Sequence, residues 1–140
     1  MAGQPARRDQ NGVETGLEPA QVRPGGQESP RGADNAPDNA VAAGCETFQF
    51  FSRSPRGGPA PVLSEERITA FREKCRRAKL TSAIHAPYYI NFASANNRIS
   101  FGSTAVIREE LQRGSLLGVK YLMTHLGSRK DLGQEGAIKQ

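Results

Sequence analysis

The chain lacks the features that hold a disulfide-rich, zinc-finger or membrane protein together. Its two cysteines, Cys45 and Cys75, are about thirty residues apart and have no CxxC spacing, so we expect both to be reduced. No stretch approaches the roughly 18 apolar residues that a membrane-spanning helix requires. No apolar run follows Arg7 and Arg8, as a secretory leader would need. These absences predict a cytoplasmic protein without a membrane partner.

Apolar residues are also scarce in the first part of the chain. Residues 1–40 are rich in Gly and Pro, contain no aromatic residue, and have only Val13, Leu17 and Val22 as large aliphatic residues. Burial of so little apolar surface does not offset the conformational entropy lost on folding. We therefore expect residues 1–32 to be a disordered or aberrant segment and residues 33–140 to form the folded domain.

The positive charge of the chain lies in that expected domain. The net charge is +5, and the excess of Lys and Arg over acidic residues falls after residue 43. Clustered Lys and Arg attract polyanions such as nucleic acid, although a solvated basic surface has the same composition. Charge alone therefore permits a nucleic-acid partner without distinguishing it from a basic surface.

From residue 42 onward, strand-like and helix-like segments alternate. An aromatic strand over residues 44–51 precedes a loop rich in Pro and Gly at residues 52–61. Ser64 is a suitable N-cap for a helix that would cover the sheet. The predicted apolar face of this helix contains Ile68, Phe71, Cys75 and Ala78.

A second unit repeats this order. A strand ends at His85, a helix starts at about Ser103 and stops at Gly118, and a strand over residues 119–124 leads to His125. The order β-α-β-α-β is typical of parallel strands joined by right-handed crossovers. The predicted apolar face of the second helix contains Ile107, Leu111, Gly114 and Leu117.

The loops that follow strands are long, whereas the turns that lead from helices to strands are short. This asymmetry is typical of a (β/α)8 TIM barrel, in which the βα loops form the active site. A complete barrel needs about 250 residues. The predicted fold class is therefore α/β, here an incomplete barrel of about three βα units.

The only two histidines, His85 and His125, each end an apolar run. Because the carboxyl ends of neighbouring parallel strands share one edge of a sheet, we expect the two imidazoles to lie side by side. Neutral imidazole is a good zinc ligand, and a catalytic zinc typically has three protein ligands. The residues alone leave a second interpretation open, in which each histidine packs or satisfies a backbone hydrogen bond.

Four separated motifs carry a family resemblance. They lie at residues 45–56, 85–94, 107–118 and 125–128, and their order and spacing closely resemble the endonuclease IV family of apurinic/apyrimidinic endonucleases over about residues 33–140. Two departures stand out. Leu126 replaces the proline of the family's His-Pro-Gly-Ser motif, and the family's first Gly-Ala-His strand has no counterpart better than residues 25–32.

This resemblance implies a monomeric TIM-barrel enzyme of DNA base excision repair that holds three zinc ions. Such an enzyme cleaves the phosphodiester 5′ to an abasic site in double-stranded DNA and leaves a 3′-hydroxyl and a 5′-deoxyribose phosphate. Two of the zinc ligands would be His85 and His125. The resemblance also implies that Arg56, Tyr88 and Tyr89 contact the DNA.

No residue of the chain matches the later Glu, Asp and His ligands of that family. We therefore expect a truncated endonuclease domain that alone binds zinc poorly and cleaves nothing. Two alternatives stay open: a sugar isomerase or epimerase of the xylose isomerase type, which shares the barrel, and a basic DNA-binding remnant without catalysis. Salt-dependent duplex binding that is insensitive to a chelator would favour the remnant.

Overall fold

The computed structural model describes residues 32–140, so the predictions made for the residues before Gly32 lie outside it. The described elements, in chain order, are α1 (Gly32–Ala42), β1 (Thr47–Phe50), α2 (Glu65–Arg77), β2 (Thr81–His85), α3 (Asn97–Leu117), β3 (Tyr121–Met123) and α4 (Gly133–Lys139). The alternation of strands and helices confirms the predicted α/β class. Among the described residues, no helix is both long and apolar enough to cross a membrane.

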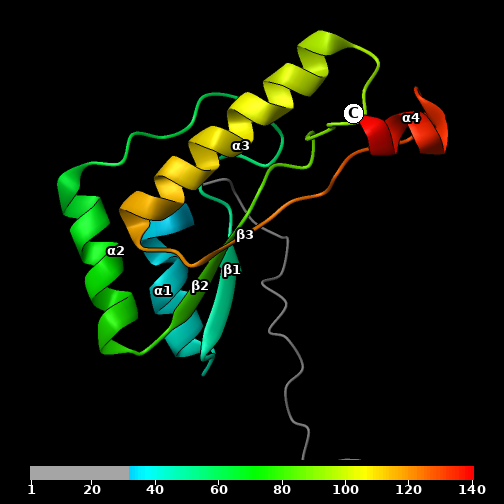
Figure 1. Cartoon of the computed structure of the whole chain (residues 1–140). Coiled ribbons are helices and arrows are strands. Elements are labelled where there is room, and N and C mark those ends of the chain that lie inside the picture. The colour runs from blue at the N-terminus through cyan, green and yellow to red at the C-terminus, as the bar shows by residue number, and fades with distance from the viewer. Residues whose placement is uncertain (1–31) are drawn as a thin grey trace, which may run out of the picture.

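The three strands form one parallel sheet in the order β1-β2-β3 (Figure 1). Phe50 pairs with Ile84, and Ile84 pairs with Leu122 on its other side. All three strands therefore end at the same edge, from which the long loops leave. This arrangement is that of an incomplete barrel of three βα units, as expected.

The core lies between one face of the sheet and the helices. Phe50 and Phe71 have ring centroids 5.2 Å apart, and Ile84 and Leu117 are almost fully buried beside them. The opposite face of β3 carries Tyr121 and Met123, which are 62% and 47% exposed. Within the described part of the chain, helices thus cover one face of the sheet, as they cover the outside of a barrel.

Helix α2 begins where its sequence predicts. The Oγ atom of Ser64 accepts a hydrogen bond from the backbone N–H of Arg67 at 3.3 Å, and the side chain of Phe71 is buried. Ile68 and Cys75 pack beside it, so three residues of the predicted face contact the core. Burial raises the pKa of the Cys75 thiol, which makes this free cysteine a poor nucleophile.

Removing the N-cap of α2 tests its contribution to the fold. We expect Ser64→Ala to lower the free energy of unfolding by about 1 kcal/mol, because one backbone N–H of the first turn loses its acceptor. Urea denaturation measures this change. The matched control is Thr69→Ala on the exposed side of the same helix, which should change stability by less than about 0.5 kcal/mol. Equal effects of the two substitutions would contradict the capping role.

Two predictions about α3 are wrong. The helix begins at Asn97, with Asn96 as its N-cap, rather than at about Ser103. Leu111, expected in the core, is 56% exposed. The buried residues of α3 are Ser100, Ser103, Glu110, Arg113, Gly114 and Leu117. Apolar periodicity cannot identify this face of α3, because many of the residues that the face buries are polar.

Helix α1 is not predicted by the sequence, because its segment is poor in large apolar residues. Salt bridges tie it to α2: Arg67 contacts Asp34 at 2.8 Å and Lys74 contacts Asp38 at 2.6 Å. The small side chain of Ala33 is buried in the core. Distant charged partners on α2 therefore stabilise a helix for which the local sequence gives little signal.

Candidate functional site

The two histidines meet at the edge of the sheet where the strands end. Their ring centroids are 5.3 Å apart. His85 is the last residue of β2 and pairs with Met123, so His125 follows two residues beyond the paired position on β3. The imidazole of His85 is buried, whereas His125 is exposed. The expected proximity of the two imidazoles is therefore present, and their role as metal ligands stays a prediction.

Contacts with Phe51, Ala86 and Tyr88 fix the orientation of the His85 imidazole. Its Nδ1 lies 2.6 Å from the carbonyl oxygen of Ala86, and because a carbonyl can only accept, Nδ1 is the donor. This assigns the free lone pair to Nε2, the nitrogen that can bind a metal. The rings of Phe51 and Tyr88 pack against the imidazole with centroid distances of 5.1 Å and 5.5 Å.

The donor chemistry of this pair fits zinc, for which imidazole nitrogen is a common ligand. Among residues 32–140, however, no group of three or more His, Cys, Asp or Glu side chains could hold a metal ion. Because a catalytic zinc takes three protein ligands, the described residues supply only part of such a site.

The loops that follow β2 and β3 are joined directly. The Oδ1 atom of Asn91 accepts a hydrogen bond from the N–H of Ser128 at 3.0 Å, and the N–H of Phe92 donates to the carbonyl of Leu126 at 3.1 Å. Between them, Gly127 has a φ of +112°, and a Cβ atom there would overlap Asn91 Oδ1. Only glycine fits this crossing, which places the loop of His125 against the loop of His85.

The three predicted DNA-contacting residues lie on two neighbouring loops at the same edge. Arg56 is exposed in the loop between β1 and α2, and Tyr88 and Tyr89 are 60% and 41% exposed in the loop after β2. The N–H of Tyr88 donates to the carbonyl of Pro55 at 3.2 Å. Exposed aromatic rings on one loop and an exposed arginine on the neighbouring loop suit a nucleic acid, and these roles stay predictions.

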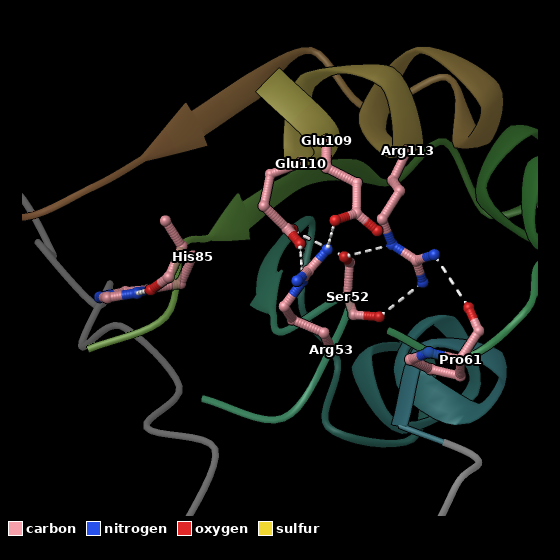
Figure 2. Close-up of polar contacts among 8 residues, drawn as sticks. Ser52, Arg53, Pro61, His85, Glu109, Glu110 and Arg113 are labelled. Atoms are coloured by element: carbon pink, nitrogen blue, oxygen red, sulfur yellow. Dashed lines mark hydrogen bonds and ion pairs between the residues drawn. The ribbon is translucent and has the colours of Figure 1, made fainter. Parts of the chain in front are cut away.

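Sequence reasoning missed a buried polar cluster next to this edge. Figure 2 shows Ser52 and Arg53, in the loop that follows β1, meeting Glu110 and Arg113 of α3; we call these four residues the polar clamp. Glu110 is completely buried. Its two carboxylate oxygens accept from Ser52 Oγ at 2.6 Å and from Arg53 Nε at 2.7 Å. No local signal in the sequence marks this cluster, because the apolar periodicity of α3 favours Leu111 rather than the buried Glu110.

The charges of the cluster balance one another. Arg53 also forms a salt bridge with Glu109, so two guanidinium groups face two carboxylates. Burial tends to lower the pKa of Arg53, but the hydrogen bonds and charges of Glu109 and Glu110 outweigh it and raise that pKa. Burial lowers the pKa of Arg113, against the opposing charge of Glu110. Paired in this way, the buried charges are tolerated.

A parallel sheet with helices on one face, and with histidines and long loops at the carboxyl ends of its strands, defines a protein of the βα-barrel class. The sequence profile of the xylose isomerase-like TIM barrel family matches residues 37–140. The chain belongs to this family.

Within it, the chain is similar to proteins named endonuclease 4. It is 38% identical to a probable endonuclease 4 of Cenarchaeum symbiosum, covering 78% of this chain and 40% of that protein. The endonuclease 4 of Thermus thermophilus is 37% identical, with 78% of this chain and 41% of that protein covered. A crystal structure of endonuclease IV from Thermus thermophilus superposes with a TM-score of 0.67, at 33% identity and over 78% of this chain and 41% of the other. The chain thus spans about two fifths of the length of these relatives.

Proposed function

We propose that this chain contributes part of a zinc-dependent apurinic/apyrimidinic endonuclease of the deoxyribonuclease IV type. The reaction is cleavage of the phosphodiester 5′ to an abasic site in double-stranded DNA, leaving a 3′-hydroxyl and a 5′-deoxyribose phosphate. The observation that carries the proposal is the histidine pair, 5.3 Å apart at the strand ends and next to the loops of Arg56 and Tyr88. The relatives named endonuclease 4 support it.

Each residue has a distinct part in this proposal. His85 and His125 would hold zinc, which supplies Lewis-acid chemistry that neutralises charge on the phosphate. Arg56 would insert into the gap left when the abasic nucleotide is rotated out of the duplex, and Tyr88 and Tyr89 would present aromatic surface to the DNA beside it. Extruding a nucleotide costs least where pairing is already lost, which favours an abasic site over an intact pair.

Because the described residues supply two imidazoles rather than three ligands, we expect the 140-residue chain to bind zinc weakly and to cleave nothing on its own. Incubation with a labelled abasic duplex and zinc tests this expectation. Zinc-dependent cleavage by the purified chain would show that the expectation of inactivity is wrong while supporting the reaction itself.

Replacing the histidines tests the metal site. We expect His85→Ala and His125→Ala each to weaken zinc binding by about tenfold or more, because losing even a supporting group of a metal site typically costs about 10–100-fold. Competition against a coloured zinc chelator measures the affinity. The control is Cys45→Ser, which removes a thiol away from the pair and should leave the affinity unchanged. Wild-type affinity in both histidine variants would refute the metal site.

The decisive experiment compares binding of an abasic duplex and an undamaged duplex, with and without chelator. A preference for the abasic duplex that weakens with chelator supports the proposal. Equal, salt-dependent binding of both duplexes that ignores the chelator indicates a basic DNA-binding module instead. Absence of DNA binding at low salt contradicts both.

A further inference from the structure

Arg113 connects α3 to both ends of the loop between β1 and α2. Its Nε donates to Ser52 Oγ at 2.8 Å and its Nη2 to the Ser52 carbonyl at 2.7 Å. Its Nη1 donates to the Pro61 carbonyl at 2.9 Å (Figure 2). The planar guanidinium group holds these three donors in one fixed arrangement, so the two ends of the loop are held at a set separation.

Glu110 fixes the start of the same loop. The hydroxyl of Ser52 donates to Glu110 and accepts from Arg113, so its orientation is determined by both neighbours. Arg53 donates to the second oxygen of the same carboxylate. Because Glu110 has no exposed surface, bulk water does not compete for these bonds.

The tip of the loop lies between these fixed ends and includes a turn, in which the N–H of Gly57 donates to the Ser54 carbonyl at 3.3 Å and the N–H of Arg56 donates to Ser54 Oγ at 3.3 Å. It contains Gly57 and Gly58, whose φ values of +118° and +96° lie in the left-handed region. Its contact with the neighbouring loop includes the bond from Tyr88 N–H to the Pro55 carbonyl. A tip rich in glycine needs well-placed ends if Arg56 is to lie next to the tyrosines.

A buried ionic network is a costly way to stabilise a helix face, since apolar side chains of similar volume often serve at least as well. Here it lies beside the candidate site rather than in the centre of the core. Unlike an apolar face, the network provides directional hydrogen bonds to the backbone carbonyls of Ser52 and Pro61.

We propose that Glu110 and Arg113 are positioning residues: through the polar clamp they set the loop carrying Arg56 against Tyr88, and so determine the preference for damaged DNA. This inference rests on the proposed function, because it assigns the clamp to the same DNA-facing edge. It places the determinants of selectivity on α3, whose clamp side chains are buried and touch no DNA themselves.

The test uses Arg113→Lys in the full 140-residue chain, which keeps the positive charge but loses the planar arrangement of donors. The control is Arg108→Lys on the exposed side of α3. One measurement is hydrogen exchange of the Tyr88 amide relative to the amides of α2. The other is the ratio of affinities for a duplex with a tetrahydrofuran abasic site and a matched undamaged duplex.

In Arg113→Lys we expect the Tyr88 amide to exchange at least tenfold faster, the exchange in α2 to stay unchanged, and the preference for the abasic duplex to fall at least threefold. Affinity for the undamaged duplex should change less than twofold, and Arg108→Lys should behave as wild type. Wild-type Tyr88 exchange in a folded Arg113→Lys overturns the proposal. If Arg113→Lys does not fold, Ser52→Ala is judged by the same two measurements. A wild-type chain without abasic preference would refute the proposed function, while Tyr88 exchange still decides on the clamp.

Discussion

Gly127→Ala is expected to separate the loops that carry the two histidines. A Cβ atom at this position would overlap Asn91 Oδ1 and lie 2.7 Å from Asn91 Cα, so a backbone shift is unavoidable. The φ of +112° adds strain of about 1–3 kcal/mol for a residue with a side chain. We expect the free energy of unfolding to fall by more than about 2 kcal/mol and zinc binding to weaken together with it.

Gly133→Ala is the matched control, because Gly133 also has a positive φ, of +67°, but has open space where a Cβ would be placed. We expect Gly133→Ala to lower the free energy of unfolding by only about 1 kcal/mol, the cost of a positive φ at a residue with a side chain. Urea denaturation of both variants measures the difference, and faster hydrogen exchange at Ser128 in Gly127→Ala reports the broken link to Asn91. Equal destabilisation of the two variants would mean that Gly127 does not approach Asn91 closely.

Phe71→Ala is expected to cost about 3–5 kcal/mol of folding free energy, the range for removal of a buried aromatic side chain. Phe71 is 2% exposed and packs against Phe48 and Phe50 at centroid distances of 6.2 Å and 5.2 Å. Its ring therefore joins α2 to β1. A small domain has only about 5–15 kcal/mol of stability, so the variant should lose a large share of it and unfold at a clearly lower urea concentration.

Circular dichroism and urea denaturation check this result. The control is Phe101→Ala on α3, where the phenylalanine is 71% exposed and its removal should cost less than about 0.5 kcal/mol. If Phe71→Ala lowered the free energy of unfolding no more than Phe101→Ala, α2 would not pack on the core through Phe71.

The sequence predicted the features that depend on local signals. Ser64 followed by Glu65 and Glu66 indicated the start of α2, and an apolar run ending at a histidine indicated the end of β2. Two consecutive βα units then predicted that His125 lies near His85, because neighbouring parallel strands end at the same edge of the sheet. The fold class and the proximity of the pair follow from these few observations.

Features that depend on distant partners could not be predicted. Helix α1 is held by Arg67 and Lys74 of another helix, and the polar face of α3 is buried because Ser52 and Arg53 meet it from a loop. A pattern of apolar residues along one segment carries no information about such pairs. Periodicity therefore favours Leu111 as the core residue, where Glu110 lies instead.

The polar clamp also changes how the basic composition of the chain should be interpreted. Arg53 and Arg113 are each 7% exposed; Arg53 is paired with Glu110, and the donors of Arg113 are bonded to Ser52 and Pro61, so neither is available to displace a counterion from a phosphate. Only guanidinium and ammonium groups at the surface contribute to the dependence of DNA affinity on ionic strength. The number of ions released on binding will therefore be smaller than a count of Lys and Arg implies, and it will report the surface charge alone.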